Sequence, residues 1–303
     1  MADNKQHPAM YYEKLDNRRV RCHLCPHHCN IPSGHTGICG VRHNHDGVLV
    51  AESYGQITAL AFDPIEKKPL AGFHPGSLIL SAGSYGCNLK CSFCQNHTIS
   101  MNRKQAAKQD PFRMGRSRSV YISPEDLVEK ALELVPEGNV GIAYTYNEPL
   151  ISYEYVYDCS RLAHKEGLKN VLVSNGYVSQ EPLSGLLPFI DAMNIDLKSF
   201  GDEFYREICG GISQHVKNTI EMAAKSCHVE VTTLIIPGLN DSEEEMEELA
   251  SWLSSVSPEI PLHLSRFFPN YKMLDRPSTP PEKIYSLVDI AREYLRNVYT
   301  GNL

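Results

Sequence analysis

Short apolar runs, separated by polar or amphipathic stretches, recur along the chain from residue 77 onward. Six of them have the length and the Val, Ile and Leu content typical of buried strands. They cover residues 78–82, 140–146, 170–174, 192–196, 229–236 and 262–268. No tight hairpin turn joins one run to the next, and helical signals fill the intervals. The pattern predicts six β/α units around a parallel sheet, in an α/β domain that spans residues 77–303.

Three of the intervening helices have recognisable starts. Ser123 precedes Pro124 and two acids, and Ser242 precedes three glutamates, so both serines are expected to be N-caps. Thr279 has Glu282 three positions later and prolines between them, which predicts a capping box with proline at the first helical position. Six units are fewer than the eight of a closed barrel.

Cysteine and histidine dominate the part of the chain before the predicted sheet. Four cysteines have the spacing C-x2-C-x3-C-x9-C, formed by Cys22, Cys25, Cys29 and Cys39. Four thiolates complete either a tetrahedral zinc site or the corners of an iron–sulfur cubane, and the spacing does not separate the two. We predict a small metal-binding module at residues 1–45, because so short a unit lacks a core of its own. Residues 46–76 are expected to be a connector with some strand.

Composition narrows the class of protein. The 303 residues are 42% hydrophobic and 21% charged, which is typical of a soluble globular chain. No apolar run approaches the length of a membrane span, and the N-terminus lacks an apolar signal core, so a cytoplasmic protein is expected. Ten cysteines in that reducing compartment indicate metal binding. The net charge of −7 makes a general nucleic-acid binder unlikely, and the basic stretch 103–118 is interpreted as a solvated or docking loop.

A second cysteine group follows the first predicted strand. Cys87, Cys91 and Cys94 have the spacing C-x3-C-x2-C, and an odd number of thiols cannot pair fully as disulfides. Iron–sulfur clusters normally take four thiolates, so three predict a cubane with one iron open to an exogenous ligand. The alternative is a zinc site with His97 as a fourth ligand.

This loop, with Phe93 before its third cysteine, resembles the signature of the radical S-adenosylmethionine (SAM) superfamily. The resemblance implies a [4Fe–4S] cluster on Cys87, Cys91 and Cys94, with SAM chelating the open iron. It also implies an open (β/α)6 partial TIM barrel, and a 5′-deoxyadenosyl radical that abstracts hydrogen from a substrate. The sequence identifies neither that substrate nor a catalytic side chain.

The cofactor-binding residues are expected where strands end, because sites of parallel β/α folds gather there. Glu148 is predicted to hold the SAM ammonium, and Asn175 its carboxylate or ribose. Lys198 is predicted to neutralise the carboxylate, with Asp196 orienting Lys198. The remaining predicted contacts come from the backbone around Phe93, from Asn147 and from Arg266.

Two families within the superfamily are similar to this chain. Activating enzymes of glycyl-radical enzymes, such as pyruvate formate-lyase activase, share the cysteine loop, the glutamate and the Asp-x-Lys pattern, but lack the N-terminal cysteine module. The radical SAM protein of the AmmeMemoRadiSam system is similar over nearly the whole chain from about residue 20. The shared motifs are Cys25-Pro26-His27, Cys39-Gly40-Val41-Arg42, residues 63–69, Gly86-Cys87-Asn88, Cys94-Gln95-Asn96, residues 144–149, residues 194–198 and residues 299–302.

The resemblance implies a reductant such as flavodoxin or ferredoxin, and AMMECR-like and Memo-like partner proteins. The leading hypothesis is therefore a radical SAM enzyme with a protein or small-molecule substrate. A glycyl-radical activase is the alternative enzyme. A non-catalytic metal-binding interaction protein, with both cysteine groups structural, is the alternative of another class.

Overall fold

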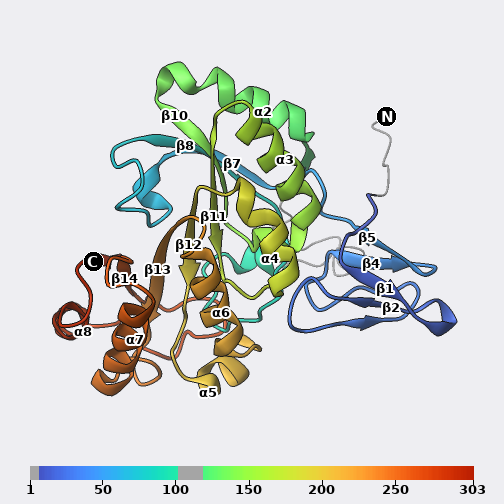
Figure 1. The fold of residues 1–303 in the computed structure, drawn as a ribbon. Helices are drawn as coiled ribbons and strands as arrows, with labels where there is room; N and C mark the ends of the chain where they lie inside the picture. The colour runs from blue at the N-terminus through green and yellow to red at the C-terminus, as the bar shows by residue number, and fades with distance from the viewer. Residues whose placement is uncertain (1–6, 102–118) are drawn as a thin grey trace.

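The structure, a computed structural model, describes residues 7–101 and 119–303. Its centre is a sheet of eight strands in the order β15-β14-β13-β12-β11-β10-β8-β7 (Figure 1). The strands are β7 (Ala59–Pro64), β8 (Leu78–Gly83), β10 (Asn139–Tyr144), β11 (Lys169–Ser174), β12 (Ala192–Asp196), β13 (His228–Ile235), β14 (Leu262–Arg266) and β15 (Val298–Gly301). All neighbours pair in parallel except β7 and β8. The six predicted strands and the mostly parallel sheet are thus confirmed.

The prediction of six parallel strands is wrong at both edges of the sheet. β7 lies antiparallel to β8 and comes from the segment expected to be a connector. β15 adds a seventh parallel strand beside β14. Both strands lie at an edge, where one side has no neighbouring strand to bury it. Their sequences therefore lack the continuous apolar run that marks a central parallel strand.

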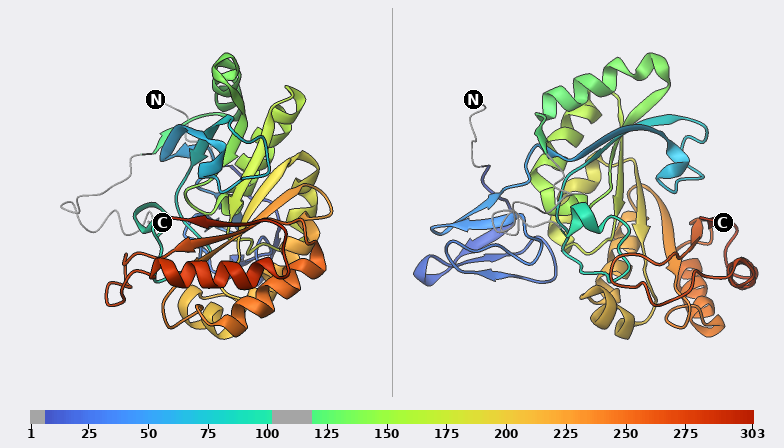
Figure 2. Two further views of the ribbon diagram at one scale, coloured as in Figure 1. Left: turned by 90° about the vertical axis from the view of Figure 1, so that its left-hand side faces the viewer. Right: turned by 180° about the vertical axis from the view of Figure 1, so that it is seen from behind.

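Helices connect the parallel strands and cover the outer face of the sheet (Figure 2). They are α1 (His97–Ser100), α2 (Pro124–Glu133), α3 (Tyr153–Lys165), α4 (Gln180–Leu186), α5 (Asp202–Phe204), α6 (Ser213–Ala223), α7 (Glu243–Val256) and α8 (Pro281–Arg292). A π-helix, Tyr205–Cys209, follows α5. Among the described residues, no helix has the length and hydropathy needed to cross a membrane.

Two of the three predicted N-caps are confirmed. Ser123 and Asp126 form a capping box at α2, and Ser242 Oγ accepts a hydrogen bond from Glu245 N at α7. The capping box predicted at Thr279 is wrong, because the Thr279 hydroxyl forms its hydrogen bonds with strand ends and not with the helix. Thr279 Oγ1 donates to Ile235 O (2.6 Å) and accepts from Phe267 N (3.2 Å), which ties together the ends of two neighbouring strands. Helix α8 begins at Pro281 without a side-chain cap.

The N-terminal residues form small antiparallel sheets beside the central one (Figure 1). They contain β1 (Tyr12–Lys14), β2 (Val20–Cys22), β3 (Asn30–Ile31), β4 (Arg42–His45) and β5 (Val48–Ala51), while β6 (Gln56–Ile57) pairs with β9 (Val120–Tyr121). Arg42 fastens this module to α3. Its buried guanidinium lies 2.9 Å from Glu154 Oε1, and the Met10 N–H donates to the same oxygen.

The segment between β7 and β8 crosses the sheet as an ordered loop. Its Ala71 and Gly72 N–H groups donate to the buried carboxylate of Glu230, at 2.9 and 2.8 Å. His228 and His263 bond the same carboxylate. These four hydrogen bonds hold the pKa of Glu230 well below its usual range, at about 2, although burial raises it. The loop is therefore fixed against the sheet.

Candidate metal and cofactor site

The three cysteines after β8 lie in one cavity with most of the predicted cofactor residues. The cavity has a volume of about 380 Å³ and lies at the C-terminal ends of the parallel strands. Its lining includes the cysteines and six of the seven predicted residues, namely Cys87, Cys91, Cys94, Phe93, Asn147, Glu148, Asn175, Asp196 and Lys198. The structure thus brings together residues that the sequence separates by more than 100 positions.

Arg266 is the predicted residue that the structure does not bring to this cavity. Its Nε donates to Thr279 O at 2.6 Å, and its guanidinium lies 4.8 Å from the Phe268 ring centroid. Successive residues of a strand face opposite sides of the sheet, and the neighbouring Ser265 lines the cavity instead. Arg266 therefore packs at the end of β14 and does not contribute to the site.

Two asparagine side chains shape the cysteine loop. Asn147 Oδ1 accepts from Ser84 N (2.9 Å), and its Nδ2 donates to the carbonyls of Tyr85 and Gly86 (3.2 Å each). Asn175 Nδ2 donates to Asn88 Oδ1 at 3.0 Å and to Cys87 Sγ at 3.5 Å. Both side chains line the cavity and orient the loop and one of its sulfurs, and their predicted contacts with SAM stay a prediction.

Glu148 is a buried carboxylate at the end of β10. Its Oε1 accepts from Ser174 Oγ (2.9 Å) and Leu150 N (3.0 Å), and its Oε2 accepts from Asn175 N (2.8 Å). Burial raises its pKa to about 7 against these hydrogen bonds, which lower it. A carboxylate oxygen has room for two acceptor contacts, so Oε2 can take a further donor from the cavity.

Lys198 places a partly buried positive charge beside the cysteines, with its side chain 14% exposed. Its ammonium lies 2.9 Å from Asp196 Oδ2, as predicted, and 5.9 Å from the Phe93 ring centroid. Burial opposes the charge, but the Asp196 carboxylate and the thiols of Cys91 and Cys209 raise the pKa of Lys198 well above its usual value. Lys198 is therefore charged and available to an anionic group in the cavity.

Cys209 is a residue that the spacing of motifs did not connect with this site. It lies in the π-helix, fully buried, and its thiol bonds Cys91. That hydrogen bond and the Lys198 ammonium lower the pKa of Cys91, against burial, which raises it. Lys90 N donates to Cys209 O at 2.7 Å, so the π-helix runs against the cysteine loop. In the sequence, the only feature that indicated a place for Cys209 near the cavity was the pair Gly210 and Gly211 that follows it.

The lining of the cavity includes a charged segment that the sequence pattern predicted to be a loop. Lys67 and Pro69 line the cavity. Lys68 is buried, bonds Asp63 Oδ2 at 2.9 Å and lies over the Tyr146 ring. Tyr146 donates to the same oxygen at 2.8 Å and has a φ of 72°, a left-handed conformation uncommon for an aromatic residue. The positions of these side chains depend on β7, which the sequence pattern did not reveal.

The sulfur positions argue against a zinc ion on the three cysteines. In a tetrahedral zinc site the sulfurs lie about 3.8 Å from one another. In the described part of the chain, one group of three ligand atoms lies mutually within 4.8 Å, and it is His43, His45 and Glu52. Neither cysteine group meets that limit. His97, the proposed fourth zinc ligand, has its Nδ1 on Cys94 O and stacks on Tyr271. The wider spacing fits a cubane.

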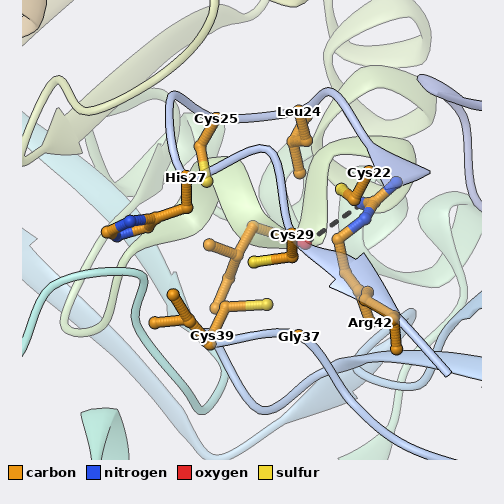
Figure 3. A pocket seen from close by; sticks show the side chains of 11 residues that line it. Cys22, Leu24, Cys25, His27, Cys29, Gly37, Cys39 and Arg42 are labelled. Atoms are coloured by element: carbon orange, nitrogen blue, oxygen red, sulfur yellow. Dashed lines mark hydrogen bonds between the residues drawn. The ribbon is translucent and has the colours of Figure 1, made fainter. Parts of the chain in front are cut away.

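The N-terminal cysteines surround a second, smaller cavity. Cys22, Cys25, Cys29 and Cys39 line it together with Arg42 and several apolar side chains (Figure 3). This cavity lies against the loop that contains Cys87, Cys91 and Cys94. His27 Nε2 lies 2.8 Å from Asn88 O, and Gly86 packs against Val41 and the Cys39 carbonyl.

Replacing Gly86 by alanine is expected to loosen this contact. Gly86 has a φ of 86°, and an added Cβ would lie 2.7 Å from Val41 Cγ1 and 2.8 Å from Cys39 O. We expect Gly86→Ala to cost about 1–3 kcal/mol of stability, measured from urea unfolding midpoints. Gly138→Ala is the matched control, since its φ is 97° but nothing lies within 4 Å of its Cβ position. Equal losses in the two variants would contradict the predicted clash.

The model of the radical SAM superfamily matches residues 82–253, which is more than half of the chain. The chain belongs to the radical SAM superfamily. It is 42% identical over 298 residues to the uncharacterized protein MJ0808 of Methanocaldococcus jannaschii, covering 97% of this chain and 85% of that protein. It is also 25% identical to the pyruvate formate-lyase 1-activating enzyme of Escherichia coli, over 55% of this chain and 65% of that enzyme.

A solved structure agrees with this superfamily fold. The radical SAM methyltransferase from Sphaerobacter thermophilus superimposes with a TM-score of 0.54 at 18% identity, over 75% of this chain and 67% of that one. Membership of the radical SAM superfamily implies a [4Fe–4S] cluster and SAM binding. The residues present fit both, because three widely spaced thiols, a buried carboxylate and a partly buried ammonium share one cavity.

Proposed function

We propose that the protein is an enzyme that reductively cleaves SAM and uses the resulting 5′-deoxyadenosyl radical to abstract hydrogen from a protein or a small molecule. The observation that carries the proposal is the shared cavity of Cys87, Cys91 and Cys94 with Glu148 and Lys198. Bound to the three thiolates, a [4Fe–4S] cluster supplies the electron that breaks the S–C5′ bond of SAM.

The side chains of the cavity match the charges of SAM. Glu148 Oε2 is the acceptor for the ammonium, and the Lys198 ammonium pairs with the carboxylate. Asp196 holds Lys198 in place at 2.9 Å. Asn147 and Asn175 act one step further out, as positioning residues for the cysteine loop. A substrate that extends beyond SAM would meet Lys67, Tyr146 and Ser265 at the cavity wall.

The test is product formation by anaerobically reconstituted protein. Incubation with SAM and a strong reductant is expected to yield methionine and 5′-deoxyadenosine in equal amounts. Protein with an intact cluster that binds SAM but forms no 5′-deoxyadenosine would overturn the proposal. A flavodoxin or a ferredoxin is the proposed natural reductant, and either should replace the chemical one.

A glycyl-radical activase is a second candidate, because the Escherichia coli relative is named as the activating enzyme of pyruvate formate-lyase. The substrate would then be a backbone glycine of a partner enzyme. An electron-spin signal on that partner after incubation with SAM would favour it. The AmmeMemoRadiSam assignment remains a prediction, and co-purification with AMMECR-like or Memo-like proteins would support it. Zinc in both cysteine groups, without SAM binding, would favour a non-catalytic metal-binding protein.

Binding of SAM is expected to depend on the ionisation of Glu148. Its pKa of about 7 means that the carboxyl is protonated below that pH and charged above it. Only the charged form attracts the SAM ammonium, so affinity should fall by up to about tenfold per pH unit as the pH drops below 7. Calorimetric titration of the reconstituted protein across this range measures the effect.

The Glu148→Gln variant should bind SAM more weakly above pH 7 and show little dependence on pH. Glu181→Gln removes an exposed carboxylate on α4 and should keep the wild-type profile. If Glu148→Gln retains the full pH dependence, Glu148 does not carry the ammonium contact.

A further inference from the structure

The cavity of the N-terminal cysteines has its own chemistry. Figure 3 shows Cys22, Cys25, Cys29 and Cys39 around one space beside Arg42. The apolar part of the wall comes from Leu24, Ile31, Ile38 and Ile151. We propose that these four cysteines bind a second [4Fe–4S] cluster, closed to SAM because the protein supplies all four ligands. The alternative is a zinc ion, which four thiolates also bind, and metal analysis distinguishes the two.

The distances between the sulfurs favour a cluster over a single ion. Four thiolates on one zinc ion lie about 3.8 Å apart. Each thiolate of a cubane binds a different iron corner, which separates the sulfurs by roughly 6 Å. Among the described residues, no cysteine group has three sulfurs mutually within 4.8 Å. With the side chains in these positions, a single zinc ion does not reach three of the four sulfurs.

Arg42, which lines the same cavity, has one buried donor without an acceptor. The two terminal nitrogens of Arg42 bond Glu154, Met10 O and Ile151 O. Its Nε, however, is buried and has no hydrogen-bond partner. Within the described part of the chain none of the cysteine sulfurs accepts from it, and a ligand with acceptor atoms bound among the cysteines would satisfy it. A zinc ion provides no acceptor, whereas the inorganic sulfides of a cubane do.

The surrounding backbone suits anionic sulfur. The N–H groups of His27, Ile38 and Val41 bond the sulfurs of Cys25, Cys29 and Cys39, respectively. The Arg42 guanidinium adds a positive charge at the wall. Hydrogen bonds to the sulfurs and a nearby cation are among the means by which proteins stabilise iron–sulfur clusters. The four cysteines and Arg42 belong to the N-terminal module, so binding of the second cluster does not depend on SAM cleavage.

The experiment isolates the second site by removing the first. A Cys87→Ala/Cys91→Ala/Cys94→Ala protein, purified anaerobically, should retain about four irons and four sulfides per chain, with a cluster absorption and a reduced-state electron-spin signal. Wild-type protein should contain about eight irons. Adding Cys25→Ala or Cys39→Ala to wild type should remove about half of the iron, which keeps the test valid if the triple variant does not fold.

Zinc analysis gives the opposite outcome. One zinc per chain in the triple variant without iron, lost on Cys25→Ala, would overturn the proposal. His43→Ala is the control, since it dismantles the compact group of His43, His45 and Glu52 and removes any zinc held there. Zinc that disappears with His43→Ala while four irons remain would support the proposal. Loss of 5′-deoxyadenosine formation in the triple variant tests the first site and has no bearing on the second.

Discussion

A Cys91→Ala protein is expected to form no detectable 5′-deoxyadenosine. Cys91 is buried at the cavity wall, and the Cys209 thiol and the Lys198 ammonium lower its pKa. Its loss leaves two thiolates for a cluster that normally takes at least three protein ligands, so about four irons per chain should disappear as well. Product analysis by chromatography and iron analysis on the same sample measure both effects.

Cys227→Ala is the matched control. Cys227 lies outside both cysteine groups, where its thiol donates to Ala223 O at 3.6 Å. It should keep wild-type iron and activity. Because Cys209 lies beside Cys91, a Cys91→Ala/Cys209→Ala variant tests whether Cys209 replaces the missing ligand. Full product formation by this double variant would contradict the assignment of the cluster to this loop.

The position of the site could be predicted from sequence because it depends on local signals. The spacing of Cys87, Cys91 and Cys94 and the apolar run before them are contiguous, and parallel strands bring their C-terminal ends together. Glu148 and Lys198 each follow such a run, so their place in the cavity followed from the order of strands. The pairing of Asp196 with Lys198 was predicted for the same reason.

The roles of the asparagines could not be predicted in this way. Asn147 and Asn175 lie at strand ends like Glu148, and any of the three could have contacted a ligand. Their amides also bond the cysteine loop, and these hydrogen bonds depend on side-chain geometry between segments about 60 to 90 positions apart. The apolar run at 262–268 predicted β14 correctly. It did not predict which of Ser265 and Arg266 faces the cavity.

The edge strands and the contact between the two cysteine groups could also not be predicted from the sequence. β7 is half-exposed and ends in a proline, so its pattern is that of a loop. Its pairing with β8 places Asp63 within reach of Tyr146 and Lys68. The contact of Gly86 with Cys39 O likewise follows from how the N-terminal module docks, and the residue that fixes that docking is Arg42.

Breaking the docking pair is expected to have the largest effect on stability. In Glu154→Gln the Arg42 guanidinium stays buried, with both side chains only 2% exposed in the wild type, but loses its counter-charge. Removing one partner of a buried ion pair typically costs about 3–5 kcal/mol, because an uncompensated charge remains inside the protein. The urea midpoint of the reconstituted protein measures the loss.

Two comparisons separate this effect from a general loss of charge. Asp46→Asn breaks the Arg18–Asp46 pair, whose side chains are 72% and 75% exposed, and should leave the midpoint unchanged within error. Arg42→Met/Glu154→Met removes both charges and should recover part of the stability lost in Glu154→Gln, since no lone charge is left buried. A Glu154→Gln protein as stable as Asp46→Asn would show that the docking of the N-terminal module does not depend on this pair.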